Sequence, residues 1–169
     1  MRENLAEKLP AAPALDFPDL NNTDYGLLQN SLCLNFAAIS ENVALARSLV
    51  AALIVNCRES GWDMTLSALE EIKVAVSEAV SNAIIHGYPN TDGRAQVHME
   101  LWQYQQALVV RVSDEGVGIA DVQKAMEPAF TTGEEHLGLG FAFMSSFMDE
   151  VRVNSQLGQG TVVTLIKKI

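Results

Sequence analysis

The segment from residue 65 to 88 constrains the fold more than any other part of the chain. Its apolar residues recur three or four positions apart, which is the spacing of one stripe along an α-helix. These residues are Leu69, Ile72, Val76, Val80 and Ala83. Ser67 and Glu70 have the spacing of a capping box at a helix start, and Gly87 with Pro89 is typical of a helix end. We therefore expect a long helix whose apolar stripe faces a core.

Two polar residues of this segment, Glu78 and Asn82, lie one helical turn apart and off the apolar stripe. An ionised carboxylate only accepts hydrogen bonds, and an amide oxygen is a ligand that Mg²⁺ accepts. Taken alone, this pair is more often a solvated polar face than a site. Its interpretation as a site depends on the segments downstream of the helix.

Two glycine pairs come after the helix. The first lies in Asp-Glu-Gly-Val-Gly-Ile at 114–119, directly after the apolar run 107–112 that reads as a strand. The second, Gly-Leu-Gly-Phe at 138–141, precedes a helical pattern. A glycine pair after a strand lets the backbone approach a ligand, and one before a helix offers free amides that suit phosphate. Either pair alone also occurs in ordinary turns, but the polar helix and both pairs in this order are far more specific.

These three segments resemble the N, G1 and G2 boxes of the GHKL ATPases, the Bergerat-fold group that includes gyrase, Hsp90, histidine kinases and MutL. Within that group the sequence is most similar to the small anti-sigma factor/serine-protein kinase family, on its sporulation anti-sigma-F branch. The similarity runs from about Leu32 to Lys167. It implies an α/β two-layer sandwich with a mixed, mostly antiparallel sheet and helices on one face, and the order of helical and strand patterns indicates the same class.

The resemblance also implies ATP and Mg²⁺ as ligands. Asn82 matches the residue that holds the metal, and Glu78 matches the general base. Asp114 matches the carboxylate that accepts a hydrogen bond from the adenine amine. The other residues that it implies for ATP binding are Gly116, Gly118, Thr131, Thr132, Gly138, Gly140 and Thr161.

A second helix is expected after Ser40, with Arg47 off its apolar stripe and therefore exposed. Glu41 and Arg47 resemble the family's partner-binding patch, and a planar guanidinium pairs well with carboxylates. The plain alternative for Arg47 is a solubilising surface charge.

The resemblance implies a homodimeric anti-sigma factor and serine kinase. Such a protein binds ATP-Mg, sequesters a sporulation sigma factor of the sigma-F type, and phosphorylates its anti-anti-sigma antagonist on serine. One departure favours an alternative, a nucleotide-gated sigma-binding protein with little or no kinase activity. Residues 133–137 carry Glu134 and Glu135, and His136 stands where the family has a basic residue. The ATP domain of a histidine kinase is disfavoured, because no phosphoacceptor helical hairpin is recognisable.

Composition limits the partners. The net charge of −10 argues against duplex DNA and anionic membranes, both of which repel an acidic protein. No apolar run has transmembrane length and the start lacks a signal peptide's apolar core, so we expect a cytoplasmic protein.

Further expectations concern the division of the chain into an arm and a domain, the two cysteines and His98. Residues 1–30 read as a poorly structured arm, and residues 31–169 as one ATP-binding kinase domain. Cys33 and Cys57 have no zinc-site spacing and are expected to be reduced core thiols, and His98 is expected to be exposed.

Overall fold

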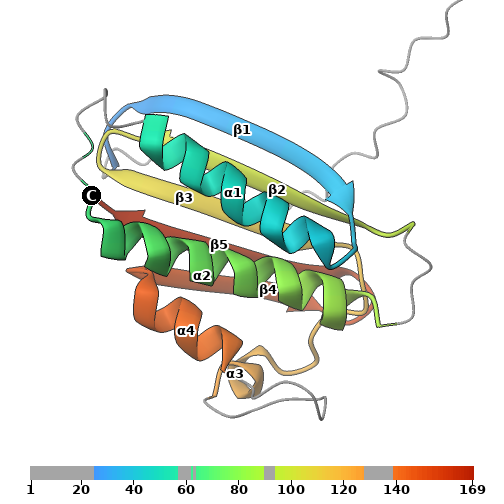
Figure 1. Ribbon diagram of the computed structural model, residues 1–169. Coiled ribbons are helices and arrows are strands. Elements are labelled where there is room, and N and C mark those ends of the chain that lie inside the picture. Colours follow the sequence, from blue (N-terminus) through green and yellow to red (C-terminus); the bar gives the residue numbers. More distant parts are fainter. Residues whose placement is uncertain (1–24, 57–61, 63, 90–93, 128–138) are drawn as a thin grey trace, which may run out of the picture.

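The computed structural model describes residues 25–56, 62, 64–89, 94–127 and 139–169 (Figure 1). Strands and helices follow one another along these ranges. They are β1 (Leu28–Ala37), α1 (Glu41–Asn56), α2 (Leu66–Asn82), the π-helical turn η4 (Ala83–Gly87), β2 (Gln96–Tyr104), β3 (Ala107–Asp114), α3 (Val122–Ala125), α4 (Gly140–Phe147), β4 (Glu150–Gln156) and β5 (Gly160–Lys168).

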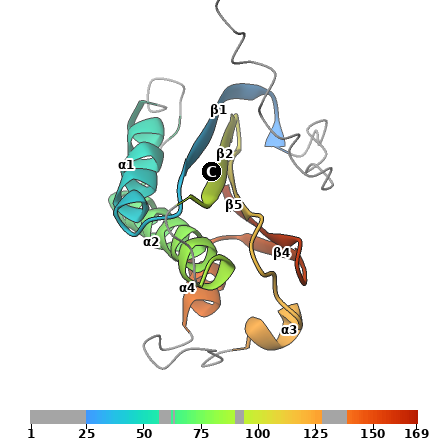
Figure 2. The ribbon, with the colours of Figure 1, turned by 90° about the vertical axis from the view of Figure 1, so that its right-hand side faces the viewer.

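The described strands form a five-stranded sheet in the order β1-β2-β3-β5-β4. Helices α1 and α2 lie on the same side of this sheet, and α4 lies beside α2 (Figure 2). The α/β sandwich is therefore confirmed. The sheet was expected to be mixed and mostly antiparallel, but all four described pairings are antiparallel. Short turns join β2 to β3 and β4 to β5, which accounts for two of these pairings. No helix in the described ranges is both long and apolar enough to cross a bilayer.

The two faces of β2 have different surroundings. Val97, Met99 and Leu101 are fully buried in the main core, which also contains the buried stripes of α1 and α2. Because side chains alternate along a strand, His98 and Glu100 lie on the opposite face of the sheet. That face carries a smaller apolar cluster, formed by Tyr25, Trp102, Tyr104, Ala107, Val109 and Ile166.

Helix α2 confirms the periodicity of the segment 65–88, since Ile72, Val76 and Val80 are completely buried. Its start was assigned wrongly. The cap is Thr65, whose Oγ1 accepts a hydrogen bond from the amide of Ala68 at 3.1 Å. Ser67 lies inside the first turn, where its hydroxyl donates to Glu71 instead.

Strand β1 begins at Leu28, inside the segment that was assigned to the arm. Tyr25 is also buried, with its ring centroid 5.8 Å from that of Tyr104. The last residues of that segment therefore pack on the sheet, whereas residues 1–24 lie outside the described ranges.

Two side chains differ from expectation. Cys33 is exposed on β1 and is no core thiol, because it alternates with residues that face the helices. The His98 side chain retains only 26% of its exposure, since it packs between neighbours on two strands. Cys57 lies outside the described residues.

The cap assignment leads to a test with a matched control. Replacing Thr65 by Ala removes the acceptor for the Ala68 amide and should lower the free energy of unfolding by about 1 kcal/mol. Replacing Ser67 by Ala should change it by less than about 0.5 kcal/mol, because Ser67 is exposed and caps no amide. Urea unfolding of both variants checks this, and a larger loss for Ser67→Ala would contradict it.

Candidate functional site

The polar turn of α2 faces the start of α4. Glu78 and Asn82 are both half-buried, and both point at Gly140, the first residue of α4. A Cβ on Gly140 would lie 2.9 Å from Glu78 Oε2 and 3.4 Å from Asn82 Nδ2. A side chain at this position would push the carboxylate away. The structure thus places the polar turn beside Gly140, the described member of the second glycine pair.

Asp114, the last residue of β3, lies at the other end of this region and is only 6% exposed. Its Oδ1 accepts a hydrogen bond from the Gly116 amide at 2.9 Å. Burial raises the pKa of Asp114 to about 6, although hydrogen bonds from the backbone of Gly116 and Thr161 oppose that rise. The carboxyl is therefore a buried acceptor that carries its charge at neutral pH at a cost in stability.

The first glycine pair packs against backbone on both sides. The Val117 amide donates to the Gly87 carbonyl at 2.9 Å, and a Cβ on Gly116 would lie 2.0 Å from that same oxygen. Gly118 has a φ of +71°, and a Cβ there would lie 2.1 Å from the Gln156 carbonyl oxygen. Only glycine permits this approach, because the backbone atoms that a Cβ would meet cannot rotate aside. The bend therefore joins the end of η4 to the turn between β4 and β5.

Sequence reasoning missed two residues that hold this bend. The Tyr88 hydroxyl accepts a hydrogen bond from the Glu115 amide at 2.8 Å, and the Ser155 hydroxyl accepts one from the Ile119 amide at 2.8 Å. Ser155 Oγ also lies 2.9 Å from Thr161 Oγ1. The position of Tyr88, directly after Gly87, was a usable signal. Nothing in the sequence marked Ser155, because only strand pairing brings it to this place.

The remaining residues predicted to bind ATP fall into two groups. Thr161, on β5, lies directly opposite Asp114 in the sheet register, so the structure brings it to the site. Thr131, Thr132 and Gly138 lie outside the described residues.

A groove of about 620 Å³ runs between α1 and α2, which lie side by side in Figure 1. Arg47 is exposed and lines this groove together with Glu78. Glu41 is exposed in the first turn of α1 but is not part of the lining. The other lining residues are Ser48, Ala51, Glu70, Lys73, Val74 and Ser77. The predicted partner residue and the predicted base thus share one surface depression.

These residues fit the ligands that the resemblance implied. Amide and carboxylate oxygens, as on Asn82 and Glu78, are what Mg²⁺ prefers. The start of α4 at Gly140 combines backbone amides with the absence of a Cβ, which suits a phosphate. The buried acceptor of Asp114 suits an amine donor such as that of adenine.

Comparisons with known proteins identify the family of this chain. The family described as the histidine kinase-like ATPase domain matches residues 36–167. An anti-sigma F factor of Clostridium acetobutylicum is 42% identical over 144 residues, which is 84% of this chain and 96% of that protein. One from Lysinibacillus sphaericus is 45% identical over 143 residues, covering 83% and 94%. One from Geobacillus kaustophilus is 44% identical over 144 residues, covering 84% and 94%.

A solved structure shows the same fold. It is the crystal structure of the RsbU and RsbW domains of Rv1364c from Mycobacterium tuberculosis, which matches with a TM-score of 0.57 and 17% identity. The match covers 82% of this chain and 32% of that longer chain. At this identity the likeness concerns the fold alone.

The raised pKa of Asp114 leads to a prediction about stability. Between pH 4 and 6 the folded protein keeps the Asp114 proton and the unfolded chain loses it, so the contribution of Asp114 to stability falls as the pH rises through that window. Asp114→Asn keeps an oxygen for the Gly116 amide without the charge. It should raise the free energy of unfolding at pH 7 by on the order of 1–3 kcal/mol and change it little near pH 4. Urea unfolding at both pH values measures this, and a loss of stability at pH 7 would overturn it.

Proposed function

The chain belongs to the histidine kinase-like ATPase family and, within it, to the anti-sigma F factors, and from this premise we propose that it is an anti-sigma factor and ATP-dependent protein-serine kinase. It binds ATP-Mg and sequesters a sporulation sigma factor of the sigma-F type. It phosphorylates the anti-anti-sigma antagonist of that sigma factor on serine. The similarity to anti-sigma F factors supports the sigma factor as partner, and the ATPase family supports the nucleotide.

The observation that carries the proposal is the groove between α1 and α2, because Arg47 and Glu78 both line it. A protein held by the exposed guanidinium of Arg47 lies along a surface that continues to the Glu78 carboxylate. Arginine is enriched among the residues that contribute most to binding at protein interfaces, and it forms bidentate pairs with carboxylates. Glu41, exposed on the same helix, extends the docking surface beyond the groove.

The nucleotide occupies the region between the polar turn of α2 and the two glycine pairs. Asn82 holds the Mg²⁺ through its amide oxygen, and Asp114 accepts a hydrogen bond from the adenine amine. ATP supplies the γ-phosphoryl group, and the Mg²⁺ bound with it would neutralise part of the negative charge on the phosphates. The remaining ATP-binding residues in this proposal are Gly116, Gly118, Thr131, Thr132, Gly138, Gly140 and Thr161.

Glu78 acts as the general base. Its carboxylate takes the proton from the substrate serine hydroxyl as the bond from the serine oxygen to the γ-phosphorus forms. The bond from that phosphorus to the bridging oxygen breaks, and ADP leaves. Glu78 is half-buried and next to Gly140, which leaves it access both to the groove and to the start of α4. The proposal further includes a homodimer and a cytoplasmic location.

Glu78→Gln tests the base. The variant should lose serine phosphorylation of the anti-anti-sigma protein by about 10²–10⁴-fold, because the amide cannot take a proton. ATP-Mg binding should stay within a few-fold of wild type, since Asn82 and Asp114 are unchanged. Phosphoserine on the antagonist, measured by mass spectrometry, and ATP binding, measured by calorimetry, separate the two effects.

Glu71→Gln is the matched control. Glu71 lies on the same helix but is ion-paired with Lys167 and does not line the groove, so this variant should keep full activity. If the wild type yields no phosphoserine with ATP and Mg²⁺, the kinase part of the proposal fails. The departure of residues 133–137 from the family pattern would then favour the nucleotide-gated sigma-binding protein.

Arg47→Ala tests the partner surface. The change should weaken capture of the sigma factor by at least about tenfold, as expected for an arginine at the centre of an interface. Arg152→Ala is the control, because Arg152 is an exposed arginine on β4 that pairs with Glu150. Pull-downs run with ATP and then with ADP measure both variants. Equal losses in the two variants would contradict a specific role for Arg47.

A further inference from the structure

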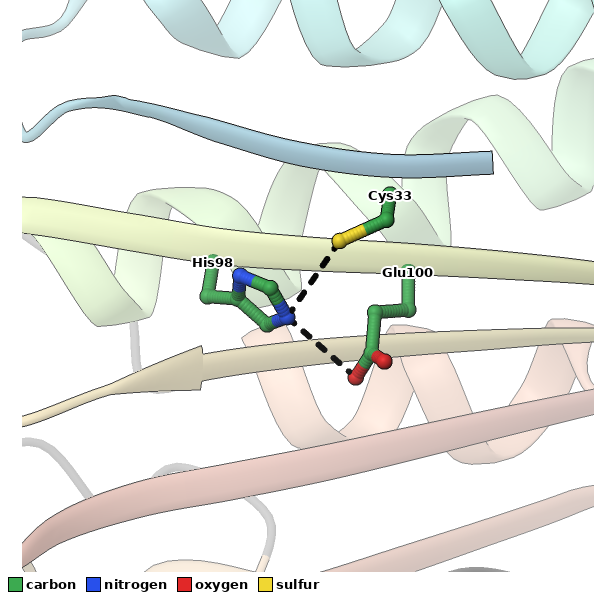
Figure 3. Close-up of side chains that lie close together, drawn as sticks. All are labelled: Cys33, His98 and Glu100. Atoms are coloured by element: carbon green, nitrogen blue, oxygen red, sulfur yellow. Dashed lines mark hydrogen bonds and ion pairs between the residues drawn. The ribbon is translucent and has the colours of Figure 1, made fainter. Parts of the chain in front are cut away.

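Three side chains of types that can bind a metal ion lie close together on the face of the sheet opposite α1 and α2 (Figure 3). This cluster consists of Cys33 from β1 with His98 and Glu100 from β2. Cys33 and Glu100 are direct cross-strand partners, and His98 lies two residues along the same face of β2. Val97, Met99 and Leu101 point the other way, into the core beneath α1 and α2. The cluster is therefore separate from the site at Glu78.

The distances within the cluster match those around a tetrahedral zinc ion. Cys33 Sγ lies 3.8 Å from His98 Nε2, and that nitrogen lies 3.5 Å from Glu100 Oε2. Bonds of about 2.3 Å to sulfur and about 2.1 Å to nitrogen and oxygen, at tetrahedral angles, put these atom pairs about 3.6 Å and about 3.4 Å apart. All three ligand atoms lie within 4.8 Å of one another. Small side-chain rotations would bring them into coordination.

Asn35 holds the His98 ring in a form that can bind a metal through Nε2. Asn35 Oδ1 lies 2.5 Å from His98 Nδ1, and Asn35 is the direct cross-strand partner of His98. An amide oxygen only accepts hydrogen bonds, so Nδ1 carries the proton and Nε2 is left to offer its lone pair. Metal-binding histidines usually have such an acceptor on their second nitrogen.

Glu100 is held in place from the other side. Arg111 on β3 donates to Glu100 Oε2 from Nε at 2.6 Å and also from Nη2, so both guanidinium contacts fall on this one oxygen. The guanidinium lies 5.2 Å from the centre of the Trp102 ring. The carboxylate has about four lone-pair positions, so this ion pair leaves others for a metal. The positive charge of Arg111 opposes a bound cation, and the two anionic ligands, thiolate and carboxylate, offset it.

We propose that Cys33 Sγ, His98 Nε2 and the Glu100 carboxylate bind Zn²⁺, with water in the fourth position. Thiolate, imidazole and carboxylate are the three ligand types that zinc accepts in proteins, and this mixture does not suit Mg²⁺ or Ca²⁺. Binding replaces the proton of the Cys33 thiol by the metal, and that proton passes to solvent. The ion links the edge strand β1 to β2, so it should stabilise the fold.

Without metal, the Cys33 thiol keeps its proton at neutral pH. Burial and the Glu100 carboxylate raise its pKa, while Arg111 lowers it.

Cobalt and zinc titrations of the full chain, stripped of metal beforehand, test this site. Co²⁺ should bind at one ion per chain with an intense tetrahedral visible spectrum and a sulfur-to-cobalt charge-transfer band, and Zn²⁺ should displace it. Zn²⁺ should also raise the melting temperature. A cobalt spectrum without the sulfur band would overturn the proposal and leave only a structural ion-pair network.

Four variants make the test specific. Cys33→Ser should abolish the sulfur band, and Cys57→Ser, which replaces the other cysteine of the chain, should keep it. Asn35→Ala should weaken Zn²⁺ binding about tenfold, and Asn35→Asp should restore it, because only the acceptor for His98 matters. Far-ultraviolet circular dichroism of each metal-free variant checks that it folds. Unchanged zinc affinity in folded Cys33→Ser would refute the site, whatever the outcome for ATP.

Discussion

The burial of one stripe of α2 against the sheet sets the direction of every other side chain on that helix. Ile72, Val76 and Val80 are completely buried, and each such side chain contributes about 1.5–3 kcal/mol by leaving water. Rotating the helix would expose them, so its orientation is firmly held. Because Glu78 and Asn82 lie off this stripe, they are directed at the first residue of α4. The packing of the hydrophobic core thus determines the direction in which Glu78 and Asn82 point.

The rest of the site depends on backbone segments that approach more closely than side chains permit. Gly116 packs on the Gly87 carbonyl, and Gly118 packs on the turn after β4. Gly87 itself packs on the Asp114 carboxylate, where a Cβ would lie 2.8 Å from Oδ1. Asp114 is buried at this place, and burial raises its pKa to about 6. A buried carboxyl of this kind is unfavourable for folding, and the molecule retains it between a glycine bend and strand β5. That arrangement is typical of a group kept for binding.

The two faces of the sheet carry different sets of residues. Along β2, one set of alternate residues fills the core under the helices, and the other set carries His98 and Glu100. The proposed nucleotide and partner surfaces lie on the helical side, and the proposed zinc ligands lie on the other. A change on one face therefore leaves the chemistry of the other face intact, provided that the strand pairing holds. This separation allows the two proposals to be tested independently.

The sequence by itself determined the local elements and the main chemical groups. The spacing of Ile72, Val76 and Val80 predicted α2, because helical and strand periods are properties of neighbouring residues. The first glycine pair was recognised as a bend. The sequence did not separate Thr65 from Ser67 as the cap, since both hydroxyls have suitable spacing. Only the tertiary structure put Ser155 beside Thr161, and Cys33 and Asn35 opposite Glu100 and His98. These neighbours are set by strand register, which depends on hairpin turns and on the packing of the core, and no spacing along the chain records it.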